Sequence, residues 1–165
     1  MKQYLTRRGF AAGAAAGGLG ALLLWRGGGG EAEAAERFEV SKTPAEWRRT
    51  LTANQYAVLR EEKTERAGSS PLDREKRRGT FACAGCGLPL FSSAAKYDSG
   101  TGWPSFFRPL PNAVGTRTDT RFFMKRTEVH CRRCGGHLGH VFDDGPKPTG
   151  LRYCMNGAAL AFRAA

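Results

Sequence analysis

The cysteines of this chain constrain its fold more than any other feature of the sequence. Four of the five form two C-x-x-C pairs, Cys83 with Cys86 and Cys131 with Cys134, and 44 residues separate the pairs. Two such pairs are typical of the two halves of a tetrahedral zinc site. The gap is longer than the ~15–20 residues of a zinc-finger module, so we expect a small domain between the halves.

Each pair is followed directly by a glycine, Gly87 or Gly135. Glycine suits a metal turn because it adopts positive φ without steric cost and leaves backbone N–H groups free to face the sulfurs. Two disulfides are the alternative to zinc. A c-type haem is excluded at both pairs, because C-x-x-C-H needs a histidine where these glycines stand. Cys154 is left over, and an odd cysteine near histidines is a candidate nucleophile.

Three longer motifs accompany the cysteines: GWPSF at 102–106, HLGHVF at 137–142 and RYCMNGAAL at 152–160. Together with both C-x-x-C pairs, they resemble the B-type methionine sulfoxide reductases, the methionine-R-sulfoxide reductase family. The likeness runs from about residue 46 to residue 162, in order and with family-like spacing. It implies a two-sheet β fold with structural zinc, and an enzyme that reduces methionine-R-sulfoxide.

Residues 1–34 are not expected to belong to the fold. Arg7 and Arg8 precede a charge-free run of 17 residues, Gly9 to Trp25, which is rich in alanine, glycine and leucine. Paired arginines before a mildly apolar segment indicate a twin-arginine export signal. A permanent membrane anchor is the alternative, but the run contains five glycines and is shorter than the ~20 apolar residues of a span. We expect residues 35–165 to form the reductase domain and to act in the periplasm.

Local patterns predict helices first and strands afterwards. Capping boxes at 43–46 and 52–55 indicate the starts of two short helices. From residue 79 onward, β-type segments alternate with turns. The expected strands lie at 81–83, 88–91, 121–131, 137–142 and 151–156. The fold class is therefore mainly β, a compact antiparallel two-sheet domain with short N-terminal helices and a four-cysteine zinc site.

Cys154 is the expected nucleophile. A thiolate attacks the sulfoxide sulfur while the oxygen leaves with a proton, and a free cysteine titrates near ~8.5, so its ionisation needs help. Arg152 lies on the same side of a regular strand and could stabilise the anion or orient a carboxylate such as Asp143. A buried structural cysteine is the alternative.

His137 and His140 are three residues apart, so at most one of them points straight into a pocket from a regular strand. The resemblance places both in the site, with His140 as proton donor to the leaving oxygen and His137 as a supporting group. Histidine suits proton transfer because its pKa lies near the working pH. The alternative for His137 is a core histidine or a neighbour of the zinc. His130 is expected to be structural or exposed.

Trp103 is the expected wall for the S-methyl group of the substrate, because sulfur–aromatic contacts are worth ~0.3–1.5 kcal/mol. Core packing is the alternative for this side chain. Phe142 is expected to line the same pocket, and the resemblance implies that Asn156 hydrogen-bonds within it.

One position departs from the family pattern. The family often has a second, resolving cysteine directly before Gly102, and this chain has Thr101 there. Cys154 then lacks a partner within the chain, so we expect an external thiol reductant, such as thioredoxin, to regenerate it. Oxidised proteins are the expected partners of a monomeric enzyme. The sequence leaves open whether free methionine sulfoxide is also reduced.

A zinc-ribbon nucleic-acid binder is the main alternative from another class, because the net charge is +11. Removal of residues 1–34 takes away four basic and two acidic residues, which leaves about +9, and zinc with four thiolates lowers this to about +7. No basic face interleaved with aromatic residues stands out, so nucleic acid is not expected as a partner. A zinc hydrolase is disfavoured because four cysteine ligands leave no open position for water.

Overall fold

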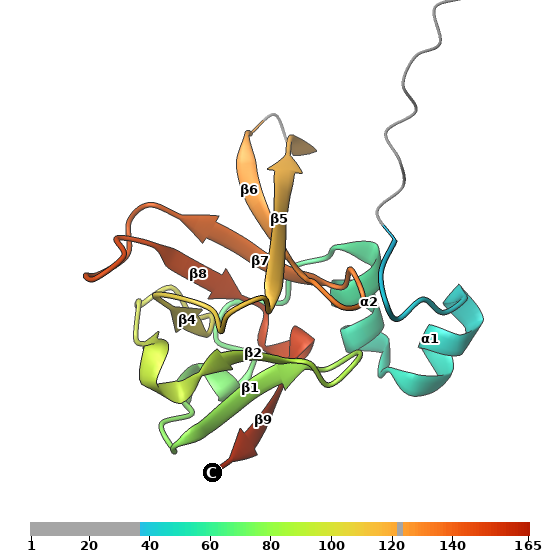
Figure 1. Cartoon of the computed structure of the whole chain (residues 1–165), viewed down its shortest axis with the longest axis horizontal. Helices are drawn as coiled ribbons and strands as arrows, with labels where there is room; N and C mark the ends of the chain where they lie inside the picture. Colours follow the sequence, from blue (N-terminus) through green and yellow to red (C-terminus); the bar gives the residue numbers. More distant parts are fainter. Residues whose placement is uncertain (1–36, 122–123) are drawn as a thin grey trace, which may run out of the picture. The chain divides into compact units, whose positions relative to one another are not determined.

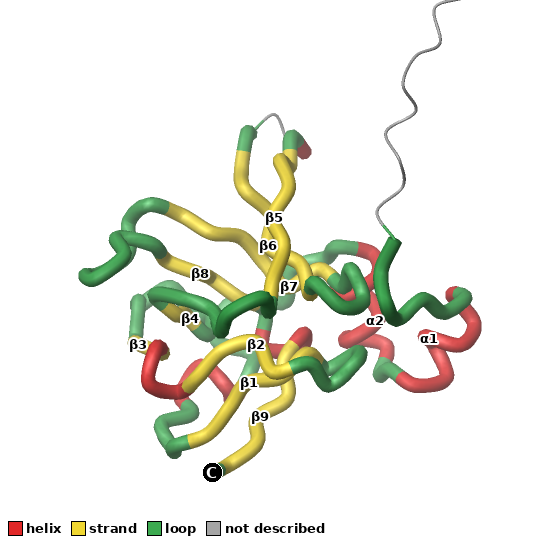
Figure 2. Tube along the Cα trace, in the orientation of Figure 1, coloured by secondary structure: helices red, strands yellow, loops and turns green. Residues whose placement is uncertain are grey.

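The computed structural model describes residues 37–121 and 124–165 (Figures 1 and 2). The expected export signal and its boundary with the reductase domain lie outside these residues. The α-helices are α1 Pro44–Thr50 and α2 Ala53–Glu61, and the 3-10 helices are η1 Pro71–Arg74, η2 Ser93–Ala95 and η4 Gly157–Ala159. The strands are β1 Gly79–Cys83, β2 Pro89–Ser92, β3 Lys96–Tyr97, β4 Ser105–Phe106, β5 Val114–Asp119, β6 Arg126–Cys131, β7 His137–Phe142, β8 Arg152–Met155 and β9 Leu160–Ala164.

Both helices start at the predicted capping boxes. The Thr43 hydroxyl accepts the Glu46 N–H, and the Glu46 carboxylate in turn accepts the Thr43 N–H at 2.7 Å. Thr52 and Gln55 repeat this arrangement at the start of α2. A cap of this kind stabilises a helix by ~1 kcal/mol, which matters because helices this short are marginal by themselves.

The strands form two antiparallel sheets, as predicted. The smaller sheet has the order β2-β1-β9, and the larger has the order β3-β4-β8-β7-β6-β5. Phe81 of β1 and Phe91 of β2 pack against Phe106 of β4, with ring centroids 5.0 and 4.3 Å away. All three rings are fully buried, so the aromatic core lies where the two sheets face each other.

The predicted strand 121–131 is wrong in its first half. Strand β6 begins at Arg126, and Asp119, its partner across the β5–β6 pair, is the last residue of β5. The residues between them connect the two strands, with Phe122 and Phe123 outside the described residues and Met124 53% exposed. The apolar run therefore predicted a strand that starts five residues too early, since β6 pairs with β5 from Arg126 onward.

Candidate active site

The two C-x-x-C pairs form knuckles at the ends of different sheets. Cys83 ends β1 in the smaller sheet, whereas Cys131 ends β6 in the larger one. Gly87 and Gly135 have the predicted positive φ, 73° and 64°. Their N–H groups donate to the carbonyl oxygens of Cys83 and Cys131, both at 2.8 Å, so the expectation that they face the sulfurs is not met.

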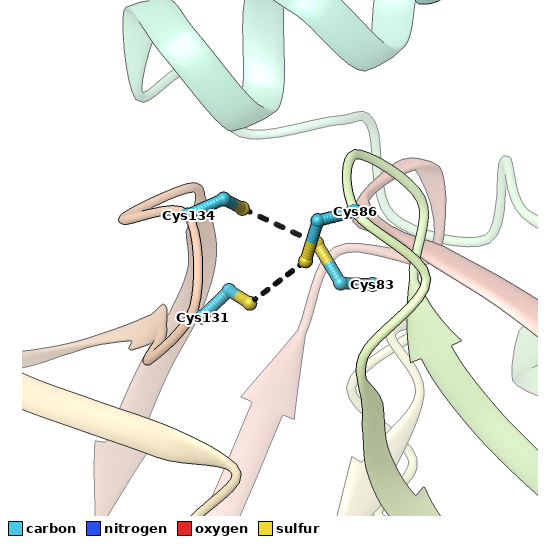
Figure 3. A group of neighbouring side chains, drawn as sticks. All are labelled: Cys83, Cys86, Cys131 and Cys134. Atoms are coloured by element: carbon cyan, nitrogen blue, oxygen red, sulfur yellow. Dashed lines mark hydrogen bonds between the residues drawn. The ribbon is translucent and has the colours of Figure 1, made fainter. Parts of the chain in front are cut away.

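The four cysteine sulfurs converge on one point between the knuckles (Figure 3). All four lie within 4.8 Å of one another, and two Sγ–Sγ distances across the knuckles are 3.7 and 3.5 Å. None of the cysteines is disulfide-bonded. The four residues Cys83, Cys86, Cys131 and Cys134 are therefore positioned to hold a metal ion.

A second feature is a cavity of about 150 Å³. Its lining contains five residues singled out from the sequence and three that were not: Trp103, His140, Phe142, Cys154 and Asn156, then Thr64, Arg126 and Gly139. His137 and Arg152, the other two predicted catalytic residues, do not line it.

The pocket is built on one face of the β7–β8 pair. His140 lies directly opposite Cys154, and Phe142 lies opposite Arg152. Because side chains alternate along a strand, these four residues share one face. Gly139 allows the close strand pairing, since a Cβ at this position would lie 2.1 Å from the carbonyl oxygen of Cys154.

Cys154 is largely screened from solvent. Burial raises the pKa of its thiol, and Thr101, Arg152 and Ser105 lower it by a smaller amount. The Thr101 hydroxyl lies 3.9 Å from the sulfur, at the position where a resolving cysteine would stand. Burial therefore makes the thiolate of Cys154 less favourable than that of a free cysteine, and a neighbouring base would assist its ionisation.

Arg152 contacts a different carboxylate from the expected one. Its guanidinium donates two hydrogen bonds of 2.7 Å to Asp144, not to Asp143. The guanidinium also lies over the ring of Phe142, 4.4 Å from its centroid. The aspartate therefore orients a cation that favours the anionic form of Cys154.

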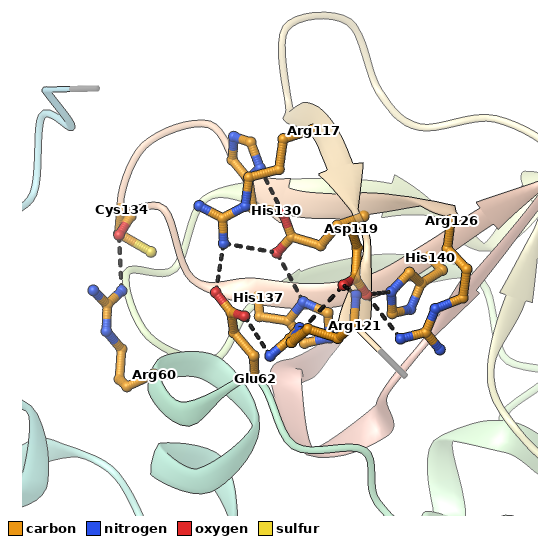
Figure 4. Close-up of polar contacts among 11 residues, drawn as sticks. Arg60, Glu62, Arg117, Asp119, Arg121, Arg126, His130, Cys134, His137 and His140 are labelled. Carbon is orange, nitrogen blue, oxygen red and sulfur yellow. Dashed lines mark hydrogen bonds and ion pairs between the residues drawn. The ribbon is translucent and has the colours of Figure 1, made fainter. Parts of the chain in front are cut away.

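The two predicted histidines have different surroundings (Figure 4). The Nε2 atom of His140 lies 2.8 Å from a carboxylate oxygen of Asp119, and its ring lines the pocket. His137 is 1% exposed, and its Nδ1 lies 2.8 Å from Glu128. Only His140 reaches the pocket, which agrees with the limit of one histidine set by the strand geometry. The ring of His137 packs against it from the interior, with the two ring centroids 5.4 Å apart.

Glu128 is the centre of this interior cluster. Burial alone would raise its pKa, but hydrogen bonds from His130 and His137 and the charge of Arg117 lower it to about 2. His130 is 2% exposed. Of the two roles expected for it, structural or exposed, the structure supports the structural one.

Trp103 and Asn156 are held by a residue that the sequence analysis missed. Glu65 is 7% exposed; its carbonyl oxygen accepts the Trp103 indole N–H at 3.1 Å, and its own N–H donates to the Asn156 side chain at 2.9 Å. Its carboxylate accepts the N–H groups of Gly157 and Ala158, the first residues of η4. One residue thus fixes two walls of the pocket.

The missed residues share one property, which is that they act through neighbours distant in sequence. Glu65 is about 90 residues from its partners in η4, and Asp119 is 21 residues from His140. Thr64 and Glu65 lie in a charged stretch of the sequence that carries none of the motifs. No local pattern distinguishes a buried carboxylate there from an exposed one.

The sequence of this chain matches a known family over most of its length. The model of the SelR domain matches residues 51–164. The chain is 50% identical over 127 residues to "Peptide methionine sulfoxide reductase MsrB" of Leptospira interrogans, covering 76% of this chain and 97% of that protein. The protein of the same name from Thiobacillus denitrificans is 57% identical over 122 residues, which cover 73% of this chain and 92% of that protein. The one from Methanosarcina barkeri is 52% identical over 125 residues, which cover 75% of this chain and 88% of that protein.

Proposed function

Because the chain belongs to the SelR-domain family of peptide methionine sulfoxide reductases, we propose that it reduces peptide-bound methionine-R-sulfoxide by attack of Cys154 on the sulfoxide sulfur. The observation that carries this proposal is the pairing of Cys154 with His140 in the wall of a small, aromatic-lined pocket. A nucleophile and a proton-transfer group then flank the same reacting atom. Family membership also removes the reason to favour a nucleic-acid binder.

The pocket suits the methionine sulfoxide side chain. Trp103 and Phe142 supply apolar surface for the S-methyl group, where sulfur–aromatic contacts add ~0.3–1.5 kcal/mol. Arg126, Asn156 and Thr64 add polar groups to the same lining. A cavity of about 150 Å³ is large enough for one side chain of this size.

The experiment that tests this function is a reductase assay with dithiothreitol and N-acetylated methionine sulfoxide, run separately on the R and S epimers. Turnover of the R epimer alone supports the proposal, whereas equal turnover of both epimers or of neither contradicts it. A parallel assay with the free amino acid shows whether a charged substrate is accepted beside Arg126.

Regeneration of Cys154 depends on Thr101. Oxygen transfer converts a cysteine to sulfenic acid, which normally condenses with a nearby thiol. The residue 3.9 Å from Cys154 is a threonine, and the other four cysteines lie in the metal cluster. We therefore infer that an external thiol, such as that of a thioredoxin-like protein, attacks Cys154 directly.

The sulfenic acid at Cys154 should consequently persist long enough to be trapped. Reduced enzyme is given one equivalent of substrate and then dimedone, and we expect the mass shift to map to Cys154. Thr101→Cys is the matched variant: it should form a disulfide with Cys154 and lose labelling, since the side chains at these positions already meet. A disulfide between wild-type Cys154 and a cluster cysteine would show that a metal ligand acts as resolving thiol.

We propose that the four-cysteine cluster holds structural zinc. Four thiolates at the ~2.3 Å Zn–S distance of a tetrahedral site stand ~3.8 Å apart, close to the 3.7 and 3.5 Å separations of the sulfurs. The ion would tie β1 of the smaller sheet to β6 of the larger one. With four protein ligands it has no open position, so its contribution is to stability and not to chemistry.

Export is proposed from the sequence alone. No helix in the described part of the chain is long and apolar enough to span a membrane. Because twin-arginine export moves folded proteins and zinc cysteines need a reducing compartment, we infer that zinc is loaded in the cytoplasm before export to the periplasm. Replacement of Arg7 and Arg8 by lysine should leave the protein in the cytoplasm by cell fractionation. Unchanged export of this variant would contradict the route.

A further inference from the structure

His140 is held from its far side by a carboxylate. Asp119, at the end of β5, is 7% exposed, and its Oδ2 lies 2.8 Å from His140 Nε2. The same oxygen accepts a 2.7 Å hydrogen bond from Arg126, and Oδ1 accepts the backbone N–H of Arg121 at 2.9 Å. Figure 4 shows Asp119 between the imidazole and the guanidinium groups.

The protonation of this pair follows from its surroundings. Burial alone would raise the pKa of Asp119, but hydrogen bonds from Arg121 and His140 outweigh it and hold the pKa well below its ordinary value. An ionised carboxylate only accepts hydrogen bonds, so the Nε2 that faces it carries a proton. Burial lowers the pKa of His140, and the charge of Arg126 lowers it further, against the opposing effect of Asp119. A neutral ring has one proton, which leaves Nδ1 as an acceptor.

We propose that Asp119 is a positioning residue that fixes His140 as its Nε2–H tautomer, so that Nδ1 serves as a base before it serves as an acid. This inference rests on the proposed function, since it assigns the proton path of that reaction. It extends the expectation from the sequence, in which His140 donates a proton to the leaving oxygen. In this tautomer Nδ1 carries no proton, so it must accept a proton before it can donate one.

The proton it takes is that of Cys154, the residue directly opposite on β8 and in the same pocket wall. Nδ1 accepts the thiol proton, the thiolate attacks the sulfoxide sulfur, and Nδ1 then returns the proton to the sulfoxide oxygen. The substrate S–O bond breaks and Cys154 becomes S–OH. Methionine gains the two electrons that the cysteine sulfur loses, and no outside proton is consumed.

The pH dependence distinguishes this path from attack by a thiolate formed in solvent. The charged or titratable groups around the ring are Asp119 from β5, Arg126 and Glu128 from β6, His137 from β7 and Cys154 from β8. With His140 as base, kcat/KM is level from about pH 7 upward, because its pKa is lowered. Without that base, the rate follows the thiolate fraction of Cys154, whose pKa is raised, and it increases about tenfold per pH unit.

Asp119→Asn is the decisive variant. The asparagine amide can donate to Nε2 and so select the Nδ1–H tautomer, which cannot take the thiol proton. We expect kcat to fall roughly 10²–10⁴-fold at pH 7 with a smaller change in KM, and the level pH profile to become steep. Glu39→Gln is the matched control, because it replaces an exposed carboxylate that pairs with Arg132 outside the pocket and should keep the wild-type profile.

A spectroscopic measurement on the wild-type protein decides the point even if Asp119→Asn fails to fold. Two-bond ¹H–¹⁵N correlation spectra identify histidine tautomers, and the His140 signals are those lost in His140→Gln. We expect the Nε2–H tautomer at pH 7. An Nδ1–H tautomer, or a folded Asp119→Asn enzyme with the wild-type kcat and pH profile, would overturn the inference. The tautomer can be read without turnover, so this result is separable from failure of the proposed function.

Discussion

The Cys154→Ser enzyme should show no measurable reduction of methionine-R-sulfoxide, a loss of at least about 10⁴-fold in kcat/KM. A serine hydroxyl is nearly the same size as the thiol, so the strand pairing with His140 is retained. It cannot, however, accept the oxygen atom to form the sulfenic acid. The measurement is the dithiothreitol assay on the R epimer, with substrate loss followed by chromatography.

Two controls separate lost chemistry from lost structure. Cys154 lies outside the metal cluster, so Cys154→Ser should keep the metal content of the wild type and unfold within a few degrees of its Tm. The variant should also resist dimedone after exposure to substrate. Wild-type turnover by this variant would mean that the nucleophile is another residue.

Removal of the metal, or of one of its ligands, should have the largest effect on folding. Structural zinc contributes ~10–16 kcal/mol in small zinc-binding peptides, which is comparable with the whole ~5–15 kcal/mol stability of a domain. Cys83→Ser and Cys131→Ser should therefore lose the cooperative thermal transition of the wild type. Because these residues belong to different sheets, equal effects would show that the ion joins both.

Metal analysis and near-UV circular dichroism provide the readouts. We expect one zinc per wild-type chain, unfolding on treatment with a strong chelator, and recovery when zinc is restored under reducing conditions. Cys154→Ser serves as the matched cysteine variant that keeps the metal. A wild-type protein without metal, in which mass mapping finds two disulfides among Cys83, Cys86, Cys131 and Cys134, would contradict the assignment.

Local sequence was sufficient for the features set by short-range chemistry. The capping boxes at Thr43 and Thr52 satisfied helix N–H groups within three residues, and the helices start there. Gly87 and Gly135 mark turns that need positive φ, and the spacing of the C-x-x-C pairs predicted one four-sulfur cluster. Each of these inferences depends on residues close in the chain or on a ligand set with one well-defined geometry.

The motifs also predicted most of the pocket, but not the partners of its residues. The resemblance gave His140 and His137 different roles, and the strand pairing places His140 opposite Cys154 while His137 contacts the buried Glu128. The choice of Asp144 over Asp143 as the partner of Arg152 was decided in the same way. Alternation along a strand is known from sequence, whereas the face that meets a given neighbour is not.

The remaining parts of the site exist only in the folded chain. Asp119 and Glu65 are charged residues in stretches with no motif. Each becomes important because folding buries it against partners distant in the chain, His140 for Asp119 and the N–H groups of Gly157 and Ala158 for Glu65. A buried carboxylate must be hydrogen-bonded, so these partners are fixed by the tertiary structure and not by local pattern. The sequence thus determined which groups perform the chemistry, and the tertiary structure decided how His140, Trp103 and Asn156 are held to perform it.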